Sequence, residues 1–161
     1  MSFVHRLTMR TINIRPVDII GSCPAGLTLA DEFQIVGMRL RNDRNSNICF
    51  LALSQIPIGQ GIWQVQSEER FFSHVTCPGC IPDLEHENRV VFLLGHADKW
   101  ELCQSISEYL RLSKRYEETE LAVKLKSVAM EQQDRGEYSA AVQTMKAAIE
   151  ALMAGRKWPL S

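Results

Sequence analysis

The sequence predicts an α+β fold in two parts: a small mixed α/β domain that carries cysteines, followed by a three-helix appendage. Short β-branched and aromatic runs separated by Gly, Pro and Asn predict strands in the first part. Beyond residue 96, apolar residues recur every three or four positions, which predicts amphipathic helices. The type of basic residue also changes there, because residues 1–96 contain eight Arg and no Lys, and every Lys lies beyond them. We therefore expect two domains, 1–96 and 97–161.

Four stretches of the first part are predicted to be strands. Residues 11–20 are rich in β-branched side chains, and Pro16 within them predicts an edge strand because proline cannot donate a backbone hydrogen bond. Residues 33–40 predict a second strand, and a polar, Asn-rich loop follows it. The apolar runs 71–76 and 89–94 predict the last two.

The second part is predicted to hold three amphipathic helices. Asp98 with Glu101 three residues later predicts a capping pair at the start of the first helix. Gly136 separates the second helix from the third, and Gly155 ends the third. The predicted helices cover about 98–114, 117–133 and 137–154.

Composition and charge are those of a folded, soluble protein. Hydrophobic residues make up 45% and charged residues 23% of the 161, and the formal net charge is −1. No stretch concentrates Lys or Arg, so we expect neither a nucleic-acid partner nor an anionic membrane partner. No apolar run approaches the roughly 20 residues that span a bilayer, and residues 1–10 lack the apolar segment of a signal peptide. We expect a cytoplasmic protein.

Cysteines are the residues of the first part that carry chemistry. Cys77-Pro78-Gly79-Cys80 is a turn that can direct two thiolates at one point, and it makes half of a metal site. Cys23 lies in a Gly- and Pro-containing turn, and Cys49 lies near the start of a predicted short helix, 48–55. We predict that Cys23, Cys49, Cys77 and Cys80 bind a metal. Four thiolates suit a structural zinc ion, which we favour, or an iron–sulfur cluster.

Other interpretations of these cysteines remain open. Cys77 and Cys80 could be a surface thiol pair, with Cys23 and Cys49 packed in the core. The C-x-x-C turn could instead cycle between dithiol and disulfide, as in a thiol redox protein. His86 is a candidate substitute ligand near the turn.

Two further observations limit the choice of site. Cys103 falls on the apolar stripe of a predicted helix, so we expect it to be a core residue and not a ligand. No sequence motif pairs His74 or His96 with a cysteine, as a catalytic base would require. The sequence contains none of the common nucleotide-binding, zinc-protease or serine-hydrolase motifs, so we expect no enzyme.

Three cysteine-bearing segments within residues 10–95 form a pattern. It consists of Gly21-x-Cys23-Pro24-x-Gly26, Phe33 in a strand, Cys49 with Ala52 at a helix start, and Cys77-Pro78 before the strand Val90–Leu94. This pattern resembles a family of small prokaryotic proteins of uncharacterised function, which carry three comparably placed cysteines. The resemblance implies that Cys23, Cys49 and Cys77 act together. Cys80 and the helical part depart from the family pattern.

The end of the chain, about residues 122–155, resembles a single tetratricopeptide repeat, a helical hairpin that binds other proteins. Small residues stand where its two helices approach each other, and Gln132 replaces the aromatic residue usual there. One such repeat cannot bury both of its faces. The matching positions are Leu125, Val128, Ala129, Gly136, Tyr138, Ala141, Val142, Met145, Ala148 and Ile149.

These observations predict a non-catalytic accessory or adaptor protein. Its cysteine domain would hold the metal, and its helices would bind a protein partner or form a homo-oligomer. An iron–sulfur electron-transfer subunit of a larger redox complex is the first alternative, and a C-x-x-C thiol redox protein is the second.

Overall fold

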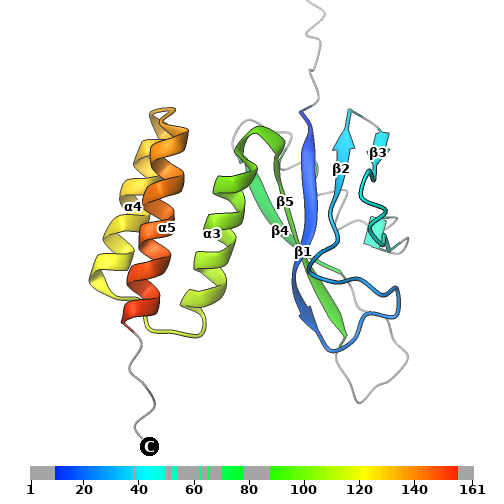
Figure 1. The fold of residues 1–161 in the computed structure, drawn as a ribbon, viewed down its shortest axis with the longest axis horizontal. Helices are drawn as coiled ribbons and strands as arrows, with labels where there is room; N and C mark the ends of the chain where they lie inside the picture. Colours follow the sequence, from blue (N-terminus) through cyan, green and yellow to red (C-terminus); the bar gives the residue numbers. More distant parts are fainter. Residues whose placement is uncertain are drawn as a thin grey trace, which may run out of the picture. The chain divides into compact units, whose positions relative to one another are not determined.

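The protein is described by a computed structural model (Figure 1), in which the placed residues are 10–37, 39–49, 52–53, 62, 65, 70–77 and 88–155. Contacts between residues divide the chain into two compact units, Met1–Asp98 and Lys99–Ser161. Each unit is described by itself below. We call them the sheet unit and the helical unit.

Over the part of the chain that the structure describes, the sheet unit is built on an antiparallel sheet of five strands in the order β3-β2-β1-β5-β4 (Figure 1). Together with the helices, this sheet confirms the predicted α+β fold class. The strands are β1 (Ile12–Ile20), β2 (Phe33–Val36), β3 (Arg39–Arg41), β4 (Phe72–Thr76) and β5 (Arg89–His96).

The prediction that residues 11–20 form an edge strand is wrong, because β1 is the central strand of the sheet. Two features of the pairing accommodate Pro16. Strand β2 pairs with β1 only from Ile12 to Ile14, so Pro16 lies beyond the end of that ladder. On the other side, the register with β5 shifts between Pro16 and Asp18. Proline is tolerated where a ladder ends or bulges, since no hydrogen bond from its nitrogen is needed there.

Residues 33–40 were predicted to be one strand, and this is also wrong. They form a hairpin in which β2 and β3 pair antiparallel, with Gln34 opposite Arg41 and Val36 opposite Arg39. Gly37 has a φ of 61°, a left-handed conformation that glycine adopts without a steric penalty. The chain therefore reverses at Gly37 instead of continuing as a strand.

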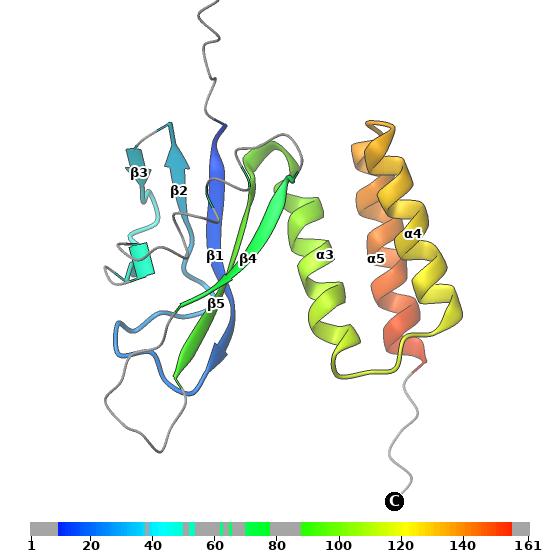
Figure 2. The same ribbon diagram turned by 180° about the vertical axis from the view of Figure 1, so that it is seen from behind.

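Over its described residues, 99–155, the helical unit contains three α-helices, as predicted (Figure 2). The predicted capping pair is not formed, because Asp98 lies in a short 3-10 helix and α3 begins after Lys99 without a side-chain cap. Thr119 caps α4 instead, since its hydroxyl accepts a hydrogen bond from the Ala122 N–H at 3.1 Å. The elements are η1 (Ala97–Lys99), α3 (Trp100–Ser113), α4 (Glu120–Asp134) and α5 (Tyr138–Ala154).

Helix α5 packs on both α3 and α4. The buried residues of α4 are only Ala122 and Ala129, so the contact between α4 and α5 depends on small side chains. Gly136, with a φ of 75°, makes the turn between them. Among the residues that the structure describes, no helix is both long and apolar enough to cross a membrane.

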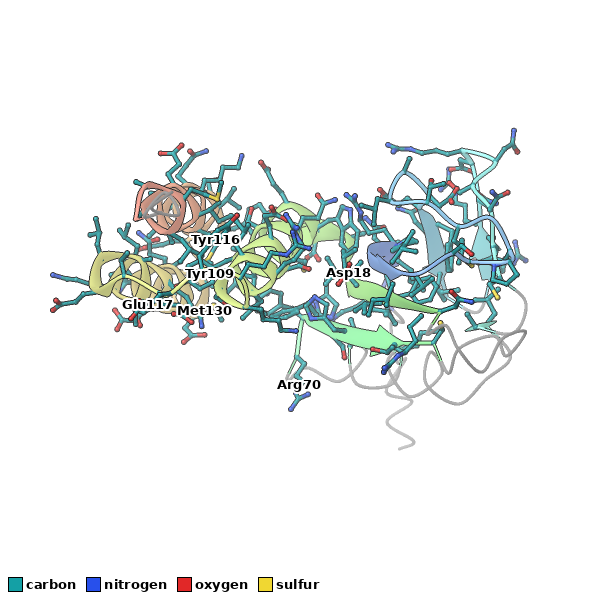
Figure 3. The ribbon with its side chains drawn as sticks, turned by 90° about the horizontal axis from the view of Figure 1, so that it is seen from below. Asp18, Arg70, Tyr109, Tyr116, Glu117 and Met130 are labelled. Atoms are coloured by element: carbon teal, nitrogen blue, oxygen red, sulfur yellow. The ribbon has the colours of Figure 1, made fainter. Side chains whose placement is uncertain are left out.

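A polar contact joins α3 to the start of α4. The fully buried Tyr109 of α3 lies between the helices (Figure 3), and its hydroxyl donates a hydrogen bond to Glu118 Oε2 at 2.9 Å. The Lys126 ammonium of α4 lies 5.3 Å from the centre of the Tyr109 ring, a cation–π distance. Burial, followed by this hydrogen bond and the Glu118 charge, raises the pKa of Tyr109 from 10.0 to about 12.

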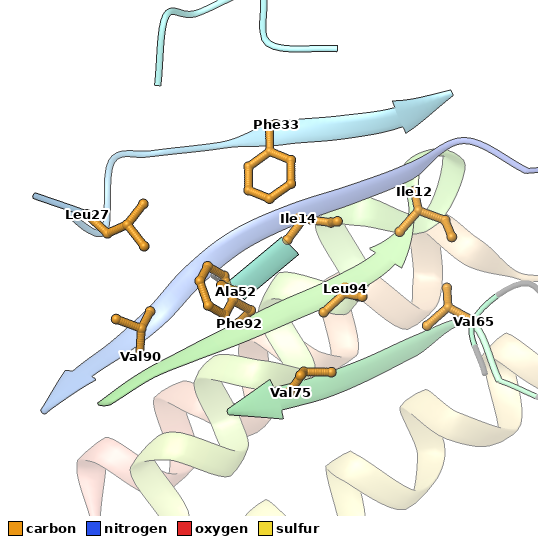
Figure 4. Close-up of a cluster of buried hydrophobic side chains, with 10 residues drawn as sticks. All are labelled: Ile12, Ile14, Leu27, Phe33, Ala52, Val65, Val75, Val90, Phe92 and Leu94. Atoms are coloured by element: carbon orange, nitrogen blue, oxygen red, sulfur yellow. The ribbon is translucent and has the colours of Figure 1, made fainter. Parts of the chain in front are cut away.

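The core of the sheet unit lies on one face of the sheet (Figure 4). Alternate residues of the strands point into it, as the pleat requires. Leu27, Ala52 and Val65 join the cluster from segments outside the strands. Its strand members are Ile12, Ile14, Phe33, Val75, Val90, Phe92 and Leu94.

Candidate cysteine site

Cys23, Cys49 and Cys77 all pack against this one hydrophobic cluster. Each is half-buried and reduced. They come from three segments that are 26 and 28 residues apart along the chain (49 − 23 and 77 − 49). The fold therefore brings three of the four predicted ligands to the border of the same core.

Cys23 lies in a turn that follows β1. The Gly26 N–H donates a hydrogen bond to the Cys23 carbonyl at 2.9 Å, which closes the turn. Gly21 and Gly26 flank it with φ values of 74° and 73°, which side chains with a Cβ rarely adopt. The Ser22 N–H donates to the Asn88 side-chain oxygen at 3.0 Å, so this turn is attached to the residue before β5.

Cys49 lies at the start of a helical segment. Ala52 and Leu53 are helical, and the Leu53 N–H donates to the Cys49 carbonyl at 3.1 Å, the four-residue spacing of an α-helix. Of the predicted helix 48–55, Ile48 and Cys49 precede the helical residues, and residues 50, 51, 54 and 55 lie outside the described part of the chain.

Cys77 directly follows β4. Its N–H donates to the Val90 carbonyl at 2.9 Å, which extends the pairing of β4 with β5 by one residue. The Val90 N–H lies 3.1 Å from the Cys77 Sγ and donates to it. Hydrogen bonds from backbone N–H groups to sulfur are also found around the cysteine ligands of metal centres.

Asp31 connects the Cys23 turn to the segment before Cys49. Its side chain is largely buried, and both carboxylate oxygens accept hydrogen bonds. Oδ2 accepts from the Thr28 N–H at 2.7 Å, and Oδ1 accepts from the Asn47 N–H at 2.9 Å. The Asn47 side-chain amide then donates to the Gly26 carbonyl at 3.0 Å. This network holds the two cysteine-bearing segments side by side.

The chemistry of the donors fits zinc or an iron–sulfur cluster, since thiolate sulfur is the ligand that both prefer. However, the described part of the chain contains no group of three or more His, Cys, Asp or Glu residues arranged to hold a metal. Cys80 and His86 lie outside the described residues. Metal binding would therefore have to draw the sulfur atoms closer together and add a ligand from the segment after Cys77.

The remaining cysteine and two histidines have other surroundings. Cys103 is fully buried in α3, which confirms the prediction that it is a core residue. His96 is buried at the end of β5, where its Nε2 is hydrogen-bonded to the Val65 carbonyl. His74 is exposed, and its ring makes an edge contact with Phe72 at 5.9 Å between centroids. Neither histidine was predicted to be catalytic.

The polar residues that position the cysteines were not predicted from the sequence. These residues form hydrogen bonds to parts of the chain that are far away in sequence. Asp31 bonds to Asn47, Asn47 bonds to Gly26, and Asn88 bonds to Ser22. One local signal was available for Asp31, because Thr28-x-x-Asp31 has the spacing of a polar turn closed by a side chain. No comparable signal pairs Asn88 with Ser22, which are 66 residues apart.

Comparisons with known proteins give no further assignment, since no family model, curated protein or solved structure matches the chain. The resemblances to the three-cysteine family and to the tetratricopeptide repeat therefore stay predictions.

Proposed function

We propose that this chain is a non-catalytic adaptor protein with two tasks. Its sheet unit binds a structural metal ion, for which zinc is favoured, through Cys23, Cys49, Cys77 and Cys80. Its helical unit provides the surface for a protein partner or for a second copy of the chain. Zinc in a closed four-thiolate site leaves no coordination position for water, so the metal would stabilise the fold and would not catalyse.

The observation that carries this proposal is the shared location of three reduced cysteines on one core. Hydrogen bonds between their segments support it, because ligands that are distant in sequence must be held by the surrounding fold. The N–H···S contact from Val90 to Cys77 supports it further, since backbone N–H groups also donate to the sulfur ligands of metal centres. A binding role for the helices is supported by Val123 of α4, an apolar side chain that is 44% exposed.

The direct test is elemental analysis of protein purified without chelators. We expect about one zinc ion per chain, and we expect each of Cys23→Ser, Cys49→Ser and Cys77→Ser to lower that content severalfold. Cys103→Ala is the matched control, because it removes a thiol from the helical unit and should leave the zinc content unchanged.

Different results would separate the alternatives. Iron with sulfide and a brown colour would indicate an iron–sulfur cluster. Metal-free protein in which Cys77 and Cys80 form a disulfide reversibly would indicate a thiol redox protein and would contradict the metal site. A zinc content that does not depend on Cys23 or Cys49 would show that these two cysteines are core residues only.

A further inference from the structure

Helix α4 exposes apolar side chains along one flank. Leu121, at its first turn, is 58% exposed, although leucine is a residue that folding normally buries. Leu125 and Val128 follow four and seven positions later, and this spacing places the three residues on one side of the helix. Leu125 and Val128 are half-buried. We call these three residues the Leu121 stripe. It lies beside the narrow face through which Ala122 and Ala129 are buried.

The end of α5 lies against the start of α4. The two helices form a hairpin about Gly136, so α5 ends where α4 begins. At this end, a Cβ added to Gly155 would clash with the Thr119 methyl carbon, so Gly155 lies directly beside the N-cap residue of α4. The chain beyond Gly155 therefore starts next to the N-cap of α4, two residues before Leu121.

Residues 156–161 have the chemistry and the length to cover the stripe. Their sequence, Arg-Lys-Trp-Pro-Leu-Ser, contains two large apolar side chains behind two cations. Six extended residues span roughly 20 Å, whereas the seven-residue rise from Leu121 to Val128 is about 10 Å. The cations would also meet Glu117 and Glu120, which are exposed at the start of α4.

We propose that residues 156–161 pack against the Leu121 stripe of the same chain. The indole of Trp158 covers Leu121 and Leu125, and Arg156 with Lys157 lies beside Glu117 and Glu120. Burying an indole against leucine removes apolar surface of both from water. The short connection to Gly155 raises the effective concentration of the segment at the stripe to the millimolar range or above. This inference is independent of metal binding by the sheet unit.

The test follows the side-chain N–H signal of Trp158 by NMR in the full-length protein. The chain has three tryptophans, and Trp158→Phe identifies the signal by its loss. The reference for an undocked indole is a free peptide of residues 156–161. We expect the Trp158 signal of the wild type to differ from that of the peptide. Leu121→Ser should move it most of the way to the peptide position.

Val123→Ser is the matched control. Val123 is also an exposed apolar residue of α4, but it projects from the opposite flank of the helix. We expect this change to leave the Trp158 signal where it is in the wild type. Far-UV circular dichroism verifies that both variants keep their helices, as the exposure of both positions predicts.

Three outcomes would overturn the proposal. One is a wild-type Trp158 signal at the peptide position, and another is an equal response to Leu121→Ser and Val123→Ser. The third is a signal that moves to the peptide position on dilution, which would mean that the segment docks on a second copy of the chain. A signal that is constant on dilution supports docking within one chain.

Discussion

The two units of this protein are held together by different kinds of contact. In the helical unit, α5 packs on both α3 and α4, and α4 contributes only Ala122 and Ala129 to its buried face. In the sheet unit, the strand order separates β3 from β4, which lie at opposite edges, and pairs β1 with the distant β5. Its turns are then joined by single polar side chains such as Asp31 and Asn88.

The two kinds of contact predict where each unit is sensitive to mutation. The contact of α4 with α5, which α4 makes through small apolar residues, should tolerate polar changes on the exposed side of the helix but not an increase in volume at the contact. A unit whose turns depend on a buried carboxylate should be sensitive to the loss of that one group. The cysteines belong to the second kind of unit, so their mutual placement depends on polar contacts as well as on the core.

The largest expected effect is that of Asp31→Ala. This change leaves the backbone N–H groups of Thr28 and Asn47 without their acceptor, and we expect it to destabilise the protein by about 2–4 kcal/mol. Denaturant unfolding measures the loss. Amide hydrogen exchange should become faster in β1 and β2 and stay unchanged in α4 and α5.

The control for this experiment is Asp43→Ala. Asp43 forms an ion pair with Arg41 at 2.6 Å, but both side chains are more than half exposed, at 62% and 60%. An exposed pair contributes little, so we expect a change within about 0.5 kcal/mol. If the two aspartate variants were equally stable, the Asp31 network would not hold the sheet unit, and the contrast between the units would be lost.

The sequence predicted the helical unit more accurately than the sheet unit, for a physical reason. Each helix is specified by its own periodicity, so α3, α4 and α5 could be located without knowledge of the rest of the chain. Strand order depends on pairing between distant segments, and Pro16 alone favoured the wrong position for β1. The hairpin was missed because the apolar pattern of residues 33–40 gave no indication that the chain reverses at Gly37.

The candidate site shows the same limit. The turn around Cys23 and the start of the helical segment at Cys49 could be predicted, because Gly, Pro and the apolar pattern mark them locally. That both cysteines, with Cys77, border one core could not be predicted, since it depends on the pairing of β1 with β5 and of β4 with β5. The polar residues that fix the turns have no periodic signal.

The second prediction concerns the small residues of the helical unit. Ala129→Leu inserts three carbon atoms at the buried contact of α4 with α5, and we expect a loss of about 1–3 kcal/mol from overpacking. Ala140→Leu is the matched control, because Ala140 is exposed on α5 and should tolerate the same change. Thermal unfolding followed by far-UV circular dichroism compares them, and an equal effect of both would contradict the role assigned to small residues.

The smallest expected effect is that of Tyr109→Phe, which removes the hydrogen bond to Glu118 and should cost about 1 kcal/mol at neutral pH. The pKa of Tyr109 is raised from 10.0 to about 12 by burial and by Glu118, so the folded protein favours the neutral phenol. The Tyr109 hydroxyl therefore makes its full contribution to the free energy of unfolding below pH 10. This contribution declines between pH 10 and about 12, because the phenol ionises at a lower pH in the unfolded chain than in the folded protein.

This pH dependence gives the cleanest measurement, because the other tyrosines and the lysines titrate in both proteins and cancel in the difference. We expect the stability difference between the wild type and Tyr109→Phe to be constant below pH 10 and to shrink above it. A difference that stays constant up to about pH 11 would mean that the phenol is not held neutral by its surroundings. The junction of α3 with α4 would then depend on apolar packing alone, like the contact of α4 with α5.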